Sequence, residues 1–127
     1  MVARVQDAGL ANITAALVTA SVVKYLQWGT GSAAAKTANA VTTTTTTEAR
    51  VSGTPSQVTT TVTNDAYQVA GTITAAGARA ITEVGVFDAA GSGSPPTGGN
   101  MDIYGDFAVV NLATADSIAF TVKVTFA

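Results

Sequence analysis

Residues 117–126 alternate large apolar side chains with small or polar ones. A period of two places the two sets on opposite faces of an extended strand. We therefore expect a half-buried β-strand whose large side chains each contribute roughly 1.5–3 kcal/mol when fully buried. Such a strand would be a main stabiliser of the fold. Its apolar face consists of Ile118, Phe120, Val122, Val124 and Phe126.

Short apolar runs separated by turn residues continue this pattern over the chain after residue 47. Gly, Pro, Asn and Asp supply the turns, and strands spaced about ten residues apart are typical of an all-β sandwich or barrel. We predict an antiparallel β-sandwich or a barrel-like, jelly-roll-like fold, with a long exposed loop at 89–99. The other expected strands are 48–52, 57–63, 66–74, 80–88 and 100–108.

The first twenty residues carry a different pattern. Leu10, Ile13 and Leu17 recur at helical spacing, and Asp7 is placed to cap the N-terminus of a helix. We predict one short helix at 7–20. An extended arm is the alternative, because glycine and β-branched residues in this stretch weaken a helix.

A stretch rich in Val and aromatic residues at 21–28 predicts another strand, and the glycines that follow predict a turn. Tyr25 and Trp28 lie on opposite faces of this strand, so one of them faces the core. Residues 32–47 are rich in Ala and Thr and have no alternation that would fix a register. We expect an ordered loop or an edge strand there, and a linker between two domains is the rival interpretation.

The overall composition limits the possible chemistry. The chain has 127 residues, no Cys and no His, which excludes disulfides, thiolate metal sites and a histidine base. Charged residues make up 11% and the net charge is −2, too little positive charge to neutralise a run of phosphates. We expect one β domain, divided into an N-terminal arm or helix at 1–20 and a β core at 21–127, with no cofactor, metal or nucleic acid.

No apolar run is long enough to span a bilayer. Asp7 and Asn12 fall where the apolar segment of a signal peptide would lie. The sequence thus predicts no membrane association, and synthesis in a cytoplasm.

Acidic residues provide the nearest approach to a catalytic constellation. Asp102 and Asp106 lie on the same face of a predicted strand, opposite to its apolar side chains. We therefore expect both to face solvent. Asp88 borders the 89–99 loop and is typical of a turn. No nucleophile has a base beside it in this pattern, and we expect no enzyme.

Glu83 is a separate case because it shares a predicted face with Ile81 and Phe87. We expect this carboxylate to be partly buried. A structural ion pair with Arg79 or Arg50 is the predicted arrangement.

Four segments occur in a familiar order: YLQWGTG at 25–31, YQVAGT at 67–72, ITEVGVFD at 81–88 and DSI at 116–118. Together they resemble small structural proteins of tailed bacteriophages, several of which look like head decoration (cement) proteins. The resemblance covers most of the chain after residue 25. It implies a β module on the outer surface of an icosahedral capsid, often a homotrimer, that bridges capsomers.

The same resemblance implies the major capsid protein and further copies of the chain as partners, in a virion assembled in the host bacterial cytoplasm. The N-terminal segment and the 89–99 loop are the expected contact elements, since an amphipathic helix needs a cover for its apolar face. The expected interface residues are Val2, Val5, Leu10, Ile13, Leu17, Trp28, Pro95 and Pro96.

Two other functions fit the same composition. A tail or fibre protein would share the β architecture and the habit of assembly. A carbohydrate-binding module would use exposed aromatic rings as stacking platforms. Its candidate residues are Tyr25, Trp28, Tyr67 and Tyr104.

Overall fold

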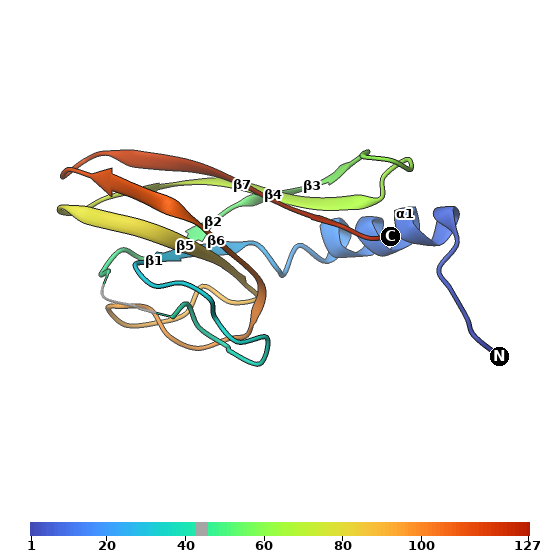
Figure 1. Ribbon diagram of the computed structural model, residues 1–127, viewed down its shortest axis with the longest axis horizontal. Coiled ribbons are helices and arrows are strands. Elements are labelled where there is room, and N and C mark those ends of the chain that lie inside the picture. Colours follow the sequence, from blue (N-terminus) through green and yellow to red (C-terminus); the bar gives the residue numbers. More distant parts are fainter. Residues whose placement is uncertain (43–45) are drawn as a thin grey trace.

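The computed structural model describes residues 1–42 and 46–127 as two antiparallel sheets packed face to face, with one helix at the end (Figure 1). The first sheet has the order β2-β1-β5-β6 and the second the order β3-β4-β7. The predicted antiparallel all-β sandwich with a short N-terminal helix is confirmed. The elements are α1 (Asp7–Ala20), β1 (Tyr25–Gly29), β2 (Val51–Ser52), β3 (Thr54–Val58), β4 (Ala66–Thr74), β5 (Arg79–Phe87), β6 (Met101–Leu112) and β7 (Ser117–Thr125).

The strand predicted at 48–52 is reduced to β2, and the one predicted at 57–63 lies earlier, as β3. The cause is Gly53, where the chain crosses from one sheet to the other. A Cβ at Gly53 would lie 2.5 Å from Cγ1 of Val69 and 3.0 Å from the carbonyl oxygen of Ala70, so only glycine fits this approach. Pro55, expected in a turn, is tolerated inside β3 because β3 is an edge strand.

Residues 30–42 and 46–50 form loops rather than an edge strand. The expected loop or edge strand at 32–47 also includes residues 43–45, which lie outside the described part of the chain.

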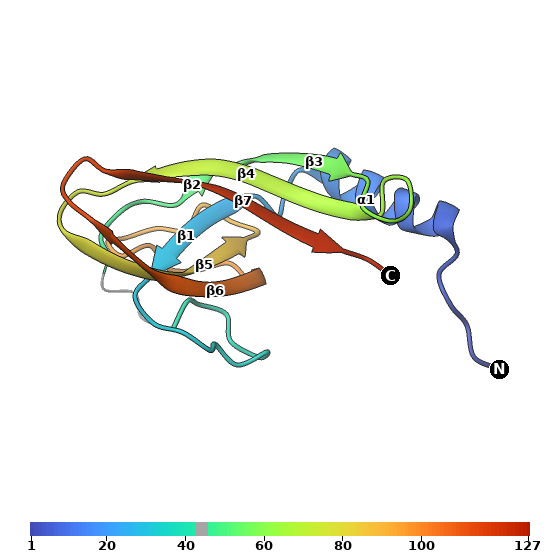
Figure 2. The same ribbon diagram turned by 45° about the horizontal axis from the view of Figure 1, so that its top comes forward.

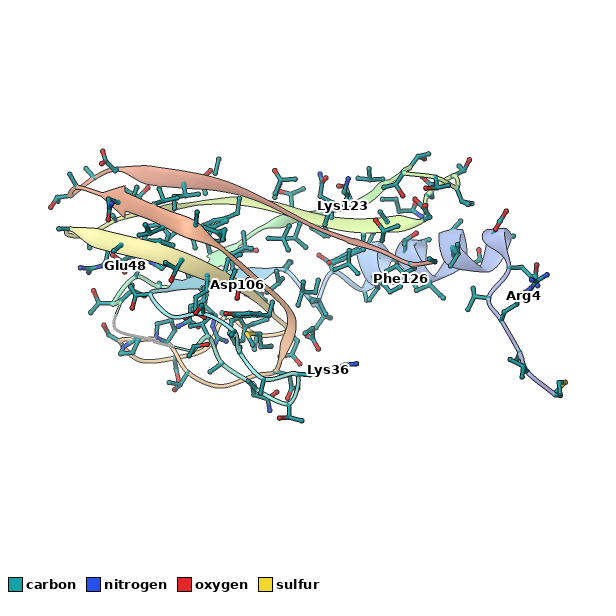
Figure 3. The ribbon with its side chains drawn as sticks, in the orientation of Figure 1. Arg4, Lys36, Glu48, Asp106, Lys123 and Phe126 are labelled. Carbon is teal, nitrogen blue, oxygen red and sulfur yellow. The ribbon has the colours of Figure 1, made fainter. Side chains whose placement is uncertain are left out.

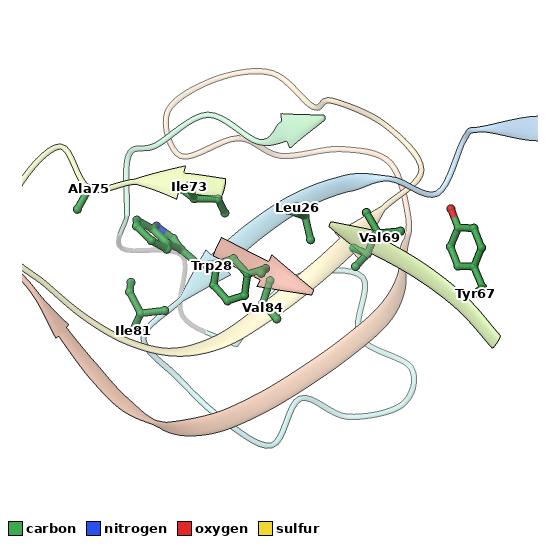
Figure 4. Packing of buried hydrophobic residues seen from close by; sticks show 10 residues of the cluster. Leu26, Trp28, Tyr67, Val69, Ile73, Ala75, Ile81 and Val84 are labelled. Atoms are coloured by element: carbon green, nitrogen blue, oxygen red, sulfur yellow. The ribbon is translucent and has the colours of Figure 1, made fainter. Parts of the chain in front are cut away.

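The core lies between the two sheets, and its largest member is Trp28 of β1 (Figure 4). Trp28 therefore faces the core, whereas Tyr25 lies half-buried on the other face of β1, where Lys24 Nζ is 5.8 Å from the centre of its ring. The hydroxyl of the buried Tyr67 donates a hydrogen bond to the carbonyl of Val23, just before β1. The other deeply buried apolar side chains include Leu26, Val69, Ile73, Ile81, Val86 and Phe87.

The final strand is half-buried, as the alternation predicts. Phe120 is 8% exposed and belongs to the core. The other four apolar side chains of 117–126 are half-buried, so this strand stabilises the fold less than five fully buried side chains would. The reason is position: β7 is an edge strand, and the edge strand of the facing sheet, β6, diverges from it beyond the turn that joins them (Figures 1 and 2).

Helix α1 packs against β3 and β4. Its N-cap residue is Gln6, without a side-chain cap, so the predicted capping role of Asp7 is wrong and Asp7 lies in the first turn. The buried Thr14 hydroxyl donates to the carbonyl of Asn64 at 2.6 Å and accepts from Nε2 of Gln57 at 2.9 Å. These contacts fix the helix on the end of the second sheet.

Residues 1–6 leave the helix and extend away from the sandwich (Figure 1). Among the described residues, no helix is long and apolar enough to cross a membrane.

Candidate docking surface

The outer face of the first sheet is covered by loops that polar side chains hold in place. Glu83 of β5 is fully buried, and its carboxylate accepts hydrogen bonds from Gly31 N at 3.1 Å, Thr42 N at 3.0 Å and the Tyr104 hydroxyl at 2.8 Å. A buried carboxylate that accepts several such bonds is well satisfied. Glu83 thus binds both ends of the 30–42 segment to the sheet through hydrogen bonds.

The predicted ion pair of Glu83 is wrong, since Nε of Arg79 instead contacts Oε1 of Glu48 at 3.0 Å. The predicted common face with Ile81 is wrong as well. The register of β5 with β6 shifts between Ile81 and Glu83, and Ile81 joins the core whereas Glu83 contacts the loops over the outer face.

Arg50 fastens the 89–99 loop in a similar way. Its guanidinium lies over the Phe87 ring, 3.6 Å from the centroid, and Nη1 donates to the carbonyls of Ala89 at 2.9 Å and Gly98 at 2.7 Å. Burial lowers the pKa of Arg50, and the nearby charge of Asp88 offsets part of this shift. Arg50, from another part of the chain, thus anchors the loop that was predicted to be long and exposed.

The open side of the sandwich carries the main apolar surface. A groove of about 490 Å³ lies between β6 and β7, and it continues into a hollow of about 420 Å³ next to the C-terminal half of α1. Ile103, Tyr104 and Val124 line both. We call the combined space the β6–β7 groove. Its other apolar lining residues include Leu17, Phe107, Val110, Ile118, Val122 and Phe126.

Both strands that border the groove are edge strands. Each is paired with one strand among the described residues, so the backbone N–H and C=O groups along its outer edge have no strand partner there and can pair with another strand. Proteins usually protect long edges with charges or bulges. The charged side chains on β6 and β7 are Asp102, Asp106 and Lys123. The two edges are therefore weakly protected against pairing with another strand.

Asp102 and Asp106 are exposed, as predicted. Asp106 accepts a hydrogen bond from Ala33 N at 2.9 Å. Asp102, which lines the groove, has no hydrogen bond or ion pair with any of the described residues. Partial burial and, secondarily, the charge of Asp88 raise the pKa of Asp102. This rim of the groove therefore favours a cation.

The expected interface residues separate into two groups. Val2, Val5 and Ile13 are exposed, Leu17 lines the groove, and Pro95 is half-buried. The remaining three are buried within the single chain, which leaves them little surface for a partner. These are Leu10, Trp28 and Pro96.

Sequence reasoning did not identify the groove itself. Periodicity predicted which side chains of β7 share a face, but it could not show that β6 and β7 are both edges. The available signal was the absence of charge from that face over the whole of 117–126.

Among residues 1–42 and 46–127, no cluster of three or more acidic side chains is arranged to hold a metal ion. Comparison of the chain with protein-family models, with curated proteins and with solved structures finds no match. Function must therefore be inferred from this surface and from the segments that carry the phage resemblance.

Proposed function

We propose that this chain is a structural subunit of a bacteriophage virion, a decoration protein that binds the major capsid protein on the outside of the head and bridges capsomers. The observation that carries the proposal is the β6–β7 groove, because its apolar lining and two free strand edges are left uncovered within one chain. Exposed apolar patches of this kind mark contact sites. A subunit of an assembly has neighbours to cover them.

The sparse charge of the chain supports the same conclusion. With 11% charged residues, less than half the usual share, few ions must be desolvated when the surface meets another protein. Depletion of charge is what distinguishes the centre of a protein interface from the rest of a surface.

The segments that carry the phage resemblance have a clear place in the fold. Residues 25–31 include β1, and residues 81–88 include most of β5. Gly85 is close-packed, since a Cβ there would lie 2.7 Å from Sδ of Met101 and 2.8 Å from Cε2 of Phe87. Residues 67–72 lie in β4, and residues 116–118 lead into β7. The four segments thus supply strands of both sheets, which is consistent with a similar fold rather than a similar reaction.

The 89–99 loop, anchored by Arg50, and residues 1–6 are the proposed contact elements. A loop held by buried hydrogen bonds loses little further conformational freedom on binding. Repeated weak contacts from neighbouring subunits, as in a homotrimer, then give firm attachment through high effective concentration.

Quantitative mass spectrometry of virus particles purified from cells that carry the gene tests this proposal. Hundreds of copies per particle are expected for a head decoration protein. A few copies would favour the alternative, a tail or fibre protein, and absence from the particles would overturn both. Electron microscopy with an antibody against the chain then locates the copies on the head or the tail.

A carbohydrate-binding module needs exposed aromatic rings, and none of the four candidate rings is fully exposed. Trp28 and Tyr67 are each 1% exposed, and the Tyr104 hydroxyl donates to Glu83. Tyr25 and Tyr104 are both half-buried. Two half-buried rings are a poor stacking platform, so we do not propose this function.

A further inference from the structure

We propose that residues 1–6 of one copy, the projecting arm, lie in extended form in the β6–β7 groove of a second copy. This inference concerns contacts between copies and stands whether the assembly belongs to a head, a tail or neither.

The arm has the properties that the groove requires. It leaves α1 with extended backbone at Gln6, whose φ is −84° and ψ is 162°. Val2 and Val5 are 97% and 52% exposed, so these apolar side chains are uncovered in a single copy. An extended segment can form hydrogen bonds with a free strand edge while its side chains enter an apolar groove, which is the geometry of β-strand addition.

Charge also matches between the arm and the groove. Arg4, the one charged side chain of the arm, has no acidic partner among the described residues. Asp102 on the rim has no cationic partner among the described residues. Asp106 lies four residues further along β6. Figure 3 shows Arg4 beyond the end of the sandwich, well apart from Asp106. Lys123 lies on the β7 side of the groove, so an arm docked with Arg4 toward β6 would place opposite charges together at a partly desolvated rim.

The arm cannot fill the groove of its own chain. Six extended residues span about 20 Å, and the fourteen residues of α1 span about 21 Å. An arm folded back along the helix therefore ends near the mouth of the groove, where Leu17 and Phe126 lie. From Phe126 to Phe120 the groove continues for about 20 Å more, beyond the reach of residues 1–6 of the same chain.

Arm exchange joins two different surfaces, the arm of one copy and the groove of the next. Such a heterologous contact either closes into a ring or grows into an open filament. A ring is the arrangement that a homotrimer would have.

The first experiment measures molar mass in solution by light scattering, for the full chain and for a variant that lacks residues 1–6. The full chain should give a defined multiple of 12.6 kDa, and the shortened chain should give the single-copy mass with the same circular dichroism and melting temperature. Because residues 1–6 are exposed, their removal leaves the core intact. A full chain of single-copy mass, or a shortened chain that still assembles, would overturn the proposal.

The second experiment locates the arm by disulfide trapping, which is straightforward because the native chain has no Cys. Copies with Val2→Cys and copies with Val122→Cys, distinguished by different tags, are co-expressed and oxidised. Val122 lines the groove on the apolar face of β7, and Thr54→Cys on the opposite edge strand of the same sheet is the matched control. At least tenfold more cross-linking to position 122 than to position 54 is expected. Equal yields would overturn the assignment of the arm to the groove.

A charge test completes the design. Arg4→Glu should weaken association at least tenfold, whereas Arg4→Lys should leave it within about threefold, since a cation remains. Equal association of both variants would contradict the match with Asp102.

Discussion

Trp28 of β1 and Phe120 of β7 pack edge to face across the sandwich, with ring centroids 6.4 Å apart and an interplanar angle of 73°. The two residues belong to different sheets, so their contact joins the layers. Phe107 of β6 packs against Phe120 from another side, with centroids 6.0 Å apart. Because Trp28 is enclosed whereas Phe107 lines the groove, Phe120 lies where the closed core meets the open side.

Trp28→Ala should lower the free energy of unfolding by about 3–5 kcal/mol, because it removes a large enclosed side chain and leaves a cavity. Urea denaturation measures the loss. A double-mutant cycle with Phe120→Ala should yield a coupling of about 0.5–1.5 kcal/mol for the ring contact. A loss below 1 kcal/mol for Trp28→Ala would show that this ring is not part of the core.

Glu83→Gln should destabilise the protein by about 1–3 kcal/mol, since the amide nitrogen replaces one acceptor oxygen and faces backbone N–H donors. Hydrogen exchange at Gly31 and Thr42 should accelerate, because their amides lose a carboxylate acceptor. Tyr104→Phe is the matched control, since it removes a single donor and leaves the carboxylate in place. Unchanged exchange at both amides would contradict the fastening role of Glu83.

Arg50→Met should loosen the 89–99 loop without unfolding the sandwich. Methionine keeps an apolar stem against Phe87 but removes the donors to Ala89 and Gly98. Hydrogen exchange should rise in residues 89–99 and remain unchanged in β4. Lys36→Met, which removes an exposed cation, should alter neither region; equal effects of the two substitutions would argue against a specific anchor.

Asp65 should make stability depend on acidity. Hydrogen bonds from the backbone of Val62 and from Thr60 and Thr61 outweigh burial and hold the pKa of Asp65 well below its ordinary value of 3.8. A depressed folded-state pKa gives stability that is present above the unfolded-state pKa and is lost as the pH falls toward the folded-state value. The melting temperature of the native chain should thus fall below about pH 5.

Asp65→Asn removes this titration, so its melting temperature should change less between pH 5 and pH 2 than that of the native chain, although it is lower at neutral pH. Hydrogen bonds from Asn100 also lower the pKa of Asp88, so part of the acid dependence should persist in this variant. Identical slopes for the two proteins would show that the Asp65 turn does not contribute.

Local sequence patterns predicted the elements whose boundaries depend on neighbouring residues. Helix α1 and strand β4 have the predicted bounds, because helical spacing in the first case and turn residues on both sides in the second are local signals. The partner of Glu83 was predicted wrongly, because the pairing of β5 with β6 is irregular between Ile81 and Glu83 and the donors lie up to 52 residues away in the sequence. No periodicity contains that information.

Alternation, helical spacing and turn residues were sufficient to predict an antiparallel β protein with a helical start, and to predict which side chains share a face of β7. Three features became visible in the folded chain alone: β6 and β7 are edges, their apolar faces meet in an open groove, and Trp28 is enclosed while Val2 and Val5 are not. Sequence period and turn chemistry act between neighbours in the chain. Burial depends instead on which sheet covers which, and that is fixed by pairings between residues far apart in the sequence.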